Sequence, residues 1–286
     1  MMADPTDFES AAEFFSDWDS CDSASAEGVA MEELAQVSWA RQLLQNLKVA
    51  QTSGHGQQQR AYLWEARVAL SIHRLGYEAQ YEYRAGEGEQ SIDFRVMSRP
   101  ELLIEAIAVR NSQASKRAGW SNEMPGITTF GVALNSTNLD QRQTTAGEMV
   151  RVVELLAGKA EKFPAPRPGI YQLIVADIRG YNIGSIDLDD CAQIALGPGA
   201  VKFDANRAFF RGDPVRGIFD SGNSHPSAIR ARQKIHGIGL FCGRNVGSPD
   251  VLSTRVCVHQ ANSFLITDQQ ELDLIGSLLD GNQPER

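Results

Sequence analysis

Residues 170–178, with the sequence Ile-Tyr-Gln-Leu-Ile-Val-Ala-Asp-Ile, form a nearly unbroken apolar run. A strand with one face in water alternates apolar and polar residues, whereas a strand covered on both faces is apolar almost throughout. The run therefore predicts a central β-strand. Helical patterns flank it along the chain, so we expect helices to cover the sheet on both faces, which is the α/β class.

Two helices and three strands are predicted ahead of this run. The first helix is expected over residues 31–51 and the second over residues 57–75, where Gly76 supplies a helix stop. The second helix has an apolar stripe at helical spacing, made of Trp64, Val68, Ile72 and Leu75. Three extended runs separated by short turns then predict an antiparallel meander, at residues 77–84, 91–97 and 102–109.

A further helix is predicted over residues 144–163, and three prolines shortly after it prevent its continuation. The expected core order is thus helix, three strands, helix and strand. Residues 110–143 are polar and too long for a simple turn, so we expect a functional loop there. Weaker patterns later in the chain predict strands near residues 200–203, 235–242 and 252–258, and a last helix over residues 268–279.

The charge of the chain is concentrated in one segment. The formal net charge is −9, but residues 1–33 contain ten acidic residues and no Lys or Arg, which leaves 27 basic against 26 acidic residues in the remainder. We expect a flexible acidic arm over residues 1–33 and one domain over residues 34–286, with its core at about 57–180 and a basic part at about 200–286. The arm is interpreted as a docking segment for a protein partner, a cover for the basic surface of its own chain, or a solubilising tail.

Several classes of protein are not indicated. No apolar run approaches the roughly 18 residues that span a bilayer, and the acidic N-terminus lacks the pattern of a secretory signal. The four cysteines show no paired spacing, and the five histidines include no helical i, i+4 pair, so we expect neither a disulfide framework nor a zinc ribbon. We therefore expect the protein to lie in the reducing cytoplasm. No phosphate-binding Gly-Lys-Ser/Thr motif and no Gly-x-Ser-x-Gly elbow is present.

Three carboxylates lie where an apolar residue would be easier to bury. Glu65 lies near the apolar stripe of the second helix, and Glu105 is the single charge in an apolar strand. Asp93 shares one face of its strand with Arg95, while Ile92, Phe94 and Val96 form the other face. A hairpin around residues 98–100 places Asp93 opposite Glu105, where like charges repel unless a cation lies between them. Carboxylate pairs of this kind bind Mg²⁺ or Mn²⁺, and Glu65 would complete or orient the metal shell. The predicted chemistry is phosphodiester hydrolysis.

The order of elements and these acids resemble the PD-(D/E)XK nuclease superfamily, which has the restriction-endonuclease-like fold. The resemblance covers roughly residues 60–180 and rests on Glu65, on the segment Ser91-Ile92-Asp93 and on the segment Ile104-Glu105-Ala106-Ile107. It implies a mixed sheet flanked by helices, with an α-β-β-β-α-β core and here a C-terminal extension. It also implies a metal-dependent nuclease in which Glu65, Asp93 and Glu105 are site residues.

One departure from the superfamily concerns its lysine, which stands two residues after the second acid, where this chain has Ile107. The helix over residues 144–163 offers substitutes: at about 100° per residue, Lys159 lies about 80° from the apolar stripe and Lys162 about 140° away, so Lys159 is expected to reach the site. Arg95 is a second choice, and Arg110 has the wrong strand parity. Each charged residue could instead belong to a structural ion pair or helix end.

The predicted function is a Mg²⁺- or Mn²⁺-dependent nuclease acting on DNA or, less favoured, RNA, as in bacterial defence. Residues 202–255 carry nine Lys or Arg against four Asp, interleaved with Phe209, Phe210 and Phe219, and could contact phosphates and bases. Two alternatives stay open: an inactive nuclease-like fold that binds nucleic acid or protein, and a protein-interaction module whose acidic arm imitates nucleic acid. Whether the chain is a monomer or a homodimer is also left open.

Overall fold

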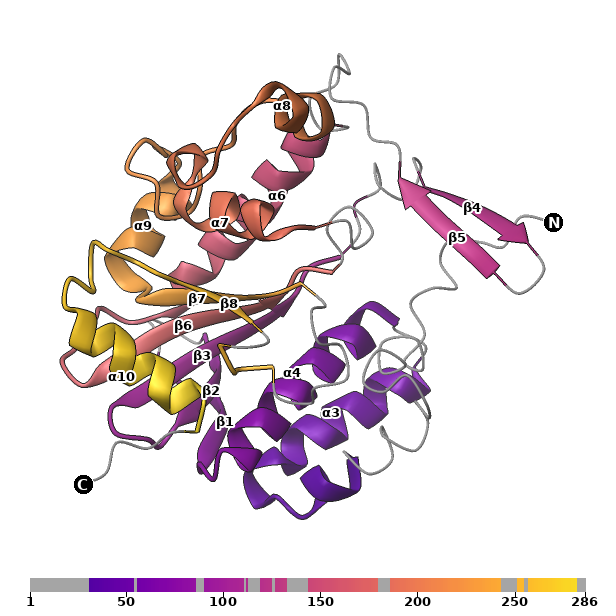
Figure 1. Cartoon of the computed structure of the whole chain (residues 1–286). Coiled ribbons are helices and arrows are strands. Elements are labelled where there is room, and N and C mark those ends of the chain that lie inside the picture. Colours follow the sequence, from indigo (N-terminus) through magenta and orange to yellow (C-terminus); the bar gives the residue numbers. More distant parts are fainter. Residues whose placement is uncertain are drawn as a thin grey trace.

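A six-stranded mixed sheet forms the centre of the molecule in the computed structural model, which describes residues 31–53, 56–85, 90–110, 112, 119–124, 127–132, 144–179, 186–242, 251–254 and 257–281. The strand order is β1-β2-β3-β6-β7-β8 (Figure 1). These strands are β1 (Ala79–Tyr83), β2 (Ile92–Val96), β3 (Glu101–Ala108), β6 (Ile170–Asp177), β7 (Gly237–Phe241) and β8 (Val258–Ala261).

The pairing follows the predicted pattern at the centre of the sheet. β1, β2 and β3 form an antiparallel meander, while β3, β6 and β7 run parallel and β8 is antiparallel to β7. Seven of the eight residues of β6 are buried, as a strand covered on both faces requires. The α/β class and the expected core order of helix, three strands, helix and strand are confirmed.

One face of the sheet is covered by α3 (Arg41–Thr52), α4 (Gly56–Arg74) and α10 (Gln269–Leu279). Trp64, Val68 and Ile72 of the predicted stripe are buried, while Leu75 is half-buried just beyond the end of α4. The indole N–H of Trp64 donates to the carbonyl of Val175 on β6 at 3.1 Å. Gly76 ends this helical segment with a φ of 78°, a conformation that residues with a Cβ rarely adopt. The hydrogen bond from Trp64 fixes the position of α4 across the centre of the sheet.

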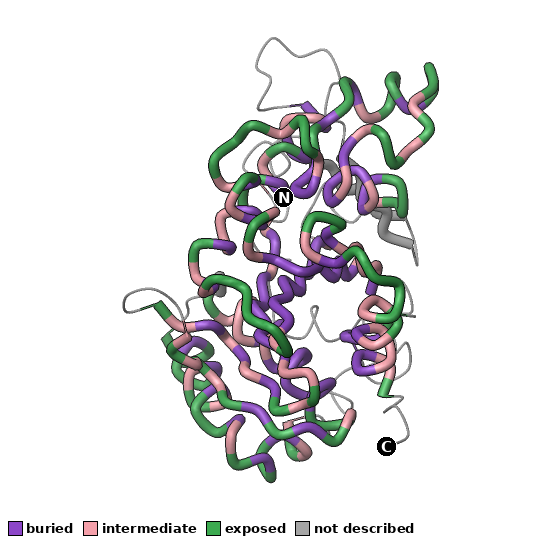
Figure 2. The backbone as a smooth tube through the Cα atoms, turned by 90° about the vertical axis from the view of Figure 1, so that its left-hand side faces the viewer, coloured by how far each residue is buried: buried purple, intermediate pink, exposed green. Residues whose placement is uncertain are grey.

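The opposite face is covered by α6 (Thr145–Gly158), η4 (Lys159–Lys162), α7 (Leu188–Leu196) and α9 (Pro226–Lys234). The hydroxyl oxygen of Thr144 accepts from the Gly147 N–H at 2.9 Å and caps α6, whose face with Met149, Val152 and Leu156 is buried. Figure 2 shows buried residues along the middle of the molecule and exposed residues on its outer turns. The two helical layers therefore enclose one sheet with a core on each side.

Several predicted elements differ from the structure. The single helix expected over residues 31–51 is interrupted by η2 (Ser38–Ala40), and the loop expected over 110–143 contains the hairpin of β4 (Gly119–Met124) and β5 (Ile127–Val132). The strand predicted near 200–203 is wrong: η6 (Pro198–Ala200) lies there, followed by α8 (Ala205–Arg211), which Asp204 caps. The strand predicted over 252–258 begins only at Val258, because Ser253 and Thr254 bond to Asp280 instead.

The acidic residues 1–30 lie outside the described residues. The described chain begins at Met31, and the carboxylate of Glu33 already contacts α4, where it binds Arg74 at 2.6 Å. Within the part of the chain that is described, no helix has the length and apolar character needed to cross a membrane.

Candidate active site

The hairpin of β2 and β3 has the register that was predicted from its turn. Phe94 pairs with Ile104 and Arg95 with Leu103, so the next pair in this register is Asp93 with Glu105. The ladder stops at Phe94, and the side chain of Asp93 takes over its role: Oδ2 accepts the Ala106 N–H at 2.8 Å. The backbone of β3 therefore holds Asp93 beside Glu105 at the point where the two strands separate.

Two lysines bind the second of these acids. Nζ of Lys159 lies 2.8 Å and Nζ of Lys162 lies 2.6 Å from Oε1 of Glu105, and Lys162 also approaches Oδ1 of Asp93 at 3.9 Å. Because one ammonium group contacts both carboxylates, Asp93 and Glu105 face the same pocket. The prediction that Lys159 reaches the site is therefore supported by geometry, but Lys162 was wrongly expected to point away.

The geometry of the helix end explains why both lysines reach the site. The α-helix stops at Gly158, and residues 159–162 form a 3₁₀ turn. With three residues per turn, positions i and i+3 of a 3₁₀ helix lie above one another, so Lys159 and Lys162 point in the same direction. An α-helical extrapolation places them about 60° apart. A Lys-x-x-Lys spacing just before a proline was the sequence signal for this arrangement.

Glu65 reaches the pocket from the other helical layer. The hydroxyl of Tyr81 on β1 donates to its Oε2 at 2.6 Å, a contact that connects α4 to the edge of the sheet. Glu65 thus lies opposite the two lysines, across the place where β2 and β3 diverge. Side chains from both helical layers reach one site because the β2–β3 ladder ends at Phe94 and Ile104.

These side chains line a pocket of about 390 Å³. All three predicted acids and both lysines belong to its wall, together with Ile107, whose side chain occupies the position of the lysine that the superfamily resemblance implies. The remaining lining residues come from α4, the end of β3 and α6: Ala61, Ala106, Ala108, Arg110, Arg151 and Leu155. The predicted site residues are therefore brought together.

Burial and mutual repulsion hold protons on two of the acids. Burial raises the pKa of Glu65 to about 8, and the neighbouring charge of Asp93 adds to the effect. Burial also raises the pKa of Asp93 to about 7, with the charge of Glu105 as the second cause. For Lys162 burial favours the neutral amine, but the charges of Asp93 and Glu105 outweigh it and raise its pKa. Without a further cation, the site therefore takes up protons near neutral pH.

The oxygen atoms of the pocket fit a hard divalent cation, although the acids are not arranged as its complete shell. Among the described residues, no group of three or more His, Cys, Asp and Glu is placed to hold a metal ion. Oε2 of Glu105, however, is buried and accepts no hydrogen bond from any described residue. An ionised oxygen buried without a donor is costly, and Mg²⁺ or Mn²⁺ prefers such ligands. Asp93 and Glu105 would hold the ion, with Glu65 at its side.

Arg110 lines the pocket, although its strand parity argued against this, whereas the other basic residues considered from the sequence lie elsewhere. Arg95 binds Glu101 at 2.7 Å and lies over the ring of Tyr83, so it does not enter the pocket. Much of the basic stretch 202–255 is used inside the fold: Arg207 binds the buried carboxylate of Asp190 at 2.8 Å. Similar contacts join Arg211 to Asp187 and Asp190, Arg232 to the carbonyls of Ile218, Asp220 and Asn223, and Lys234 to the carbonyl of Phe163. The ion pairs of Arg216 with Asp220 and of Arg230 with Glu161 are more exposed, and Arg244 and Arg255 lie outside the described residues.

The three phenylalanines expected to stack on bases differ in exposure. Phe219 is buried in the core, so it is not available to a ligand. Phe209 and Phe210 are 72% and 63% exposed and pack edge to face on α8. Of the three phenylalanines, only Phe209 and Phe210 are therefore exposed enough to stack on bases.

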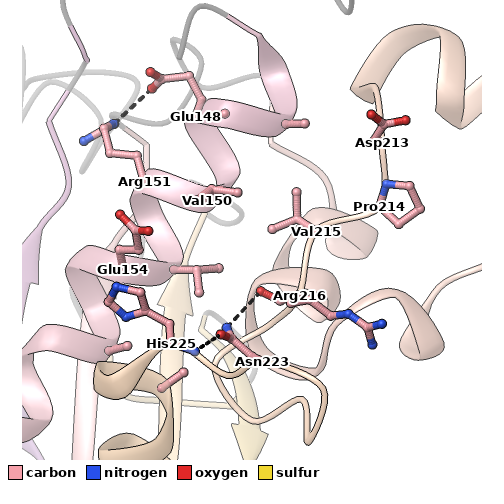
Figure 3. A pocket seen from close by; sticks show the side chains of 15 residues that line it. Glu148, Val150, Arg151, Glu154, Asp213, Pro214, Val215, Arg216, Asn223 and His225 are labelled. Atoms are coloured by element: carbon pink, nitrogen blue, oxygen red, sulfur yellow. Dashed lines mark hydrogen bonds and ion pairs between the residues drawn. The ribbon is translucent and has the colours of Figure 1, made fainter. Parts of the chain in front are cut away.

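A larger cavity of about 750 Å³ lies on the other side of α6, between that helix and residues 213–228. Figure 3 shows Arg151 in its wall, with the dashed contact to Glu148. No predicted site residue lines this cavity, but Arg151 lines both pockets and donates to the carbonyl of Arg110 at 2.8 Å. Arg151 is a site residue that sequence patterns gave no reason to select.

Comparisons with known proteins give no family for the chain. No family model matches it, and neither a curated protein nor a solved structure matches it.

Proposed function

We propose that the chain is a divalent-metal-dependent nuclease of restriction-endonuclease-like fold, which hydrolyses phosphodiester bonds of DNA. The observation that carries the proposal is the convergence of Asp93 and Glu105 with Lys159 and Lys162 in one pocket. An oxygen ligand pair beside an ammonium group is the combination that phosphoryl transfer requires, because a cation must be bound and negative charge must be neutralised.

Each residue has a separate role in this proposal. Asp93 and Glu105 would hold Mg²⁺ or Mn²⁺, and Glu65 would orient the shell. Such an ion would supply stabilisation of negative charge on the phosphate and a water of lowered pKa. Lys159 and Lys162 then exchange their contact with Glu105 for the phosphate oxygens. Hydrolysis joins the water oxygen to phosphorus and breaks one P–O ester bond, and the water proton ends on the leaving oxygen.

The position of the lysines supports this division of roles. In the superfamily that the sequence resembles, the expected lysine is on the strand, where this chain has the apolar Ile107. Here ammonium groups from η4 enter the same pocket and bind the strand acid directly. The charge is therefore supplied from the neighbouring helix end instead of from the sheet.

Plasmid cleavage in Mg²⁺ or Mn²⁺ tests the proposal. Supercoiled DNA should be nicked by the parent, and Asp93→Asn or Glu105→Gln should each reduce the rate at least about 100-fold, since a lost charge-stabilising group costs about that factor. A matched control is Asp273→Asn, which changes an exposed acid on α10. Equal cutting by the parent and both site variants would refute the proposal.

A second candidate is a nuclease-like fold that binds nucleic acid or a protein without cutting. The observation in its favour is that both lysines already neutralise Glu105, while the described residues include no group of three metal-ligating side chains. Calorimetry separates the two candidates. Uptake of Mn²⁺ favours the nuclease, and retained nucleic-acid affinity without any uptake of Mg²⁺ or Mn²⁺ favours the binding fold.

A further inference from the structure

Two arginines lie side by side beyond the ends of neighbouring parallel strands. Ala108 of β3 is in register with Asp177 of β6, and the Val109 N–H donates to the Asp177 carbonyl at 2.8 Å, so the strands continue together past their assigned ends. Two positions further along each chain are Arg110 and Arg179. Parallel strands lie about 4.8 Å apart, so these residues begin a row along the carboxyl edge of the sheet.

Buried contacts fix the guanidinium group of Arg179. Its Nε lies 3.0 Å and its Nη2 lies 3.2 Å from the two oxygens of Asp177, which is fully buried, and its Cζ lies 5.0 Å from the ring centre of Phe241. Arg60 approaches the same carboxylate from α4 at 3.9 Å. Both side chains keep some access to solvent, with 12% and 14% of the side chain exposed. Two guanidinium groups are thus held at one edge by one acid.

The row continues into the carboxylate pocket. Arg110 and Arg151 line that pocket, and Nη2 of Arg151 donates to the Arg110 carbonyl at 2.8 Å. Ala61, which follows Arg60 on α4, lines it as well. Arg110 and Arg151 therefore line the pocket itself, while Arg60 lies next to a lining residue on α4 and Arg179 follows the strand beside Arg110. We call Arg60, Arg110, Arg151 and Arg179 the arginine rim.

We propose that the arginine rim binds the backbone phosphates of a nucleic-acid strand next to the bond that is cut. The inference rests on the proposed function, because it takes the carboxylate pocket as the site of hydrolysis. Planar guanidinium groups bind phosphate oxygens through paired N–H donors, and groups that are already held in place lose little freedom on binding. A row along a sheet edge, instead of one closed pocket, matches a chain of phosphates more closely than a single anion.

Binding measured without metal tests the rim independently of cleavage. Fluorescence anisotropy of a fluorescein-labelled DNA oligonucleotide, single-stranded and duplex, is recorded with the full chain in EDTA over a range of salt. The double variant Arg60→Gln/Arg110→Gln should weaken binding at least about 10-fold and reduce the slope of log K against log salt by about 1.5, since each lost phosphate contact removes about 0.7–0.9. Arg110→Lys, which keeps the charge, should retain the slope.

Controls separate a lost contact from a lost fold. Arg216→Gln removes an arginine that is 61% exposed, pairs with Asp220 and does not line the carboxylate pocket, and it should leave the slope unchanged. Arg179→Gln could unfold the chain, because it leaves the buried carboxylate of Asp177 with only the more distant guanidinium group of Arg60. The paired change Arg179→Gln/Asp177→Asn removes both charges and should still lower the slope, with circular dichroism confirming the fold.

The outcomes distinguish the rim from the nuclease proposal. If the parent cuts DNA but folded rim variants bind it with an unchanged slope, the rim is refuted and the nuclease proposal stands. If rim variants lose binding while no protein cuts, the rim stands and the nuclease proposal fails. Poly-glutamate that competes as strongly as DNA at equal charge would assign the rim to an acidic polypeptide and overturn the inference.

Discussion

Replacing Asp93 by Asn should stabilise the metal-free protein at alkaline pH. Burial and the charge of Glu105 raise the pKa of Asp93 from 3.8 to about 7. The native state therefore holds a proton that the unfolded chain releases, so the free energy of unfolding falls as pH rises from about 4 to about 7. The unfavourable charge is then fully present at pH 8.5 and absent at low pH.

The size of this effect follows from the same change in pKa. At about 1.4 kcal/mol for each pH unit, ionising Asp93 in the native state costs at most about 4 kcal/mol. Asn keeps an oxygen for the Ala106 N–H but loses the attraction to Lys162, whose Nζ is 3.9 Å from Oδ1. We therefore expect Asp93→Asn to raise the free energy of unfolding by about 1–2 kcal/mol at pH 8.5, and by about zero at pH 4.

Urea unfolding in EDTA, followed by tryptophan fluorescence, measures this difference. Asp273→Asn on α10 serves as the control, because it removes an exposed carboxylate far from the pocket and should change stability equally at both pH values. A loss of stability for Asp93→Asn of the same size at pH 4 and pH 8.5 would refute the reasoning, since it would make Asp93 an ordinary structural partner. Saturating Mg²⁺ should cancel the advantage of the variant at pH 8.5, because only the parent keeps the anionic pair.

Three further predictions concern the cations. Lys159→Met and Lys162→Met should be coupled in a double-mutant cycle of urea unfolding by at least about 0.5 kcal/mol, because both ammonium groups contact one oxygen of Glu105; additive losses would contradict this. Ile107→Lys should restore part of the plasmid cleavage lost in Lys159→Met, since position 107 lines the same pocket, and no recovery in a folded variant would count against the proposed role of the charge. Arg207→Met should lower the free energy of unfolding by about 2 kcal/mol, because it removes one of the two guanidinium groups that bind the buried carboxylate of Asp190, while anisotropy with DNA should stay unchanged; weaker binding by the folded variant would contradict a structural role.

The central strands were predictable because burial on both faces requires nearly every residue of such a strand to be apolar. A strand covered on both faces, such as β6, has few polar residues, and the short turn between β2 and β3 determines which residues are paired. The juxtaposition of Asp93 and Glu105 follows from that register. Local patterns are sufficient where the structure depends on nearest neighbours along the chain.

Other features depend on contacts that local patterns do not contain. The apolar residues at 201 and 203 favoured a strand. Instead, the Asp204 cap and the ion pair of Arg207 with Asp190, in the first turn of α7, stabilise a helix at 205–211. Lys162 was ranked below Lys159 because an α-helical period was applied to residues that form a 3₁₀ turn. The hydrogen bond of Tyr81 to Glu65 joins residues in two elements, so no spacing in either element indicates it.

Binding of Mn²⁺, followed by electron paramagnetic resonance as the ion is titrated into the protein, tests the central claim most directly. The parent should bind the ion at pH 6.5 with release of protons, because Asp93 and Glu65 hold protons in its absence at that pH. Asp93→Asn and Glu105→Gln should each weaken this binding at least about 10-fold, in step with the loss of cleavage. Mn²⁺ binding of equal affinity in the parent and both variants would contradict the account.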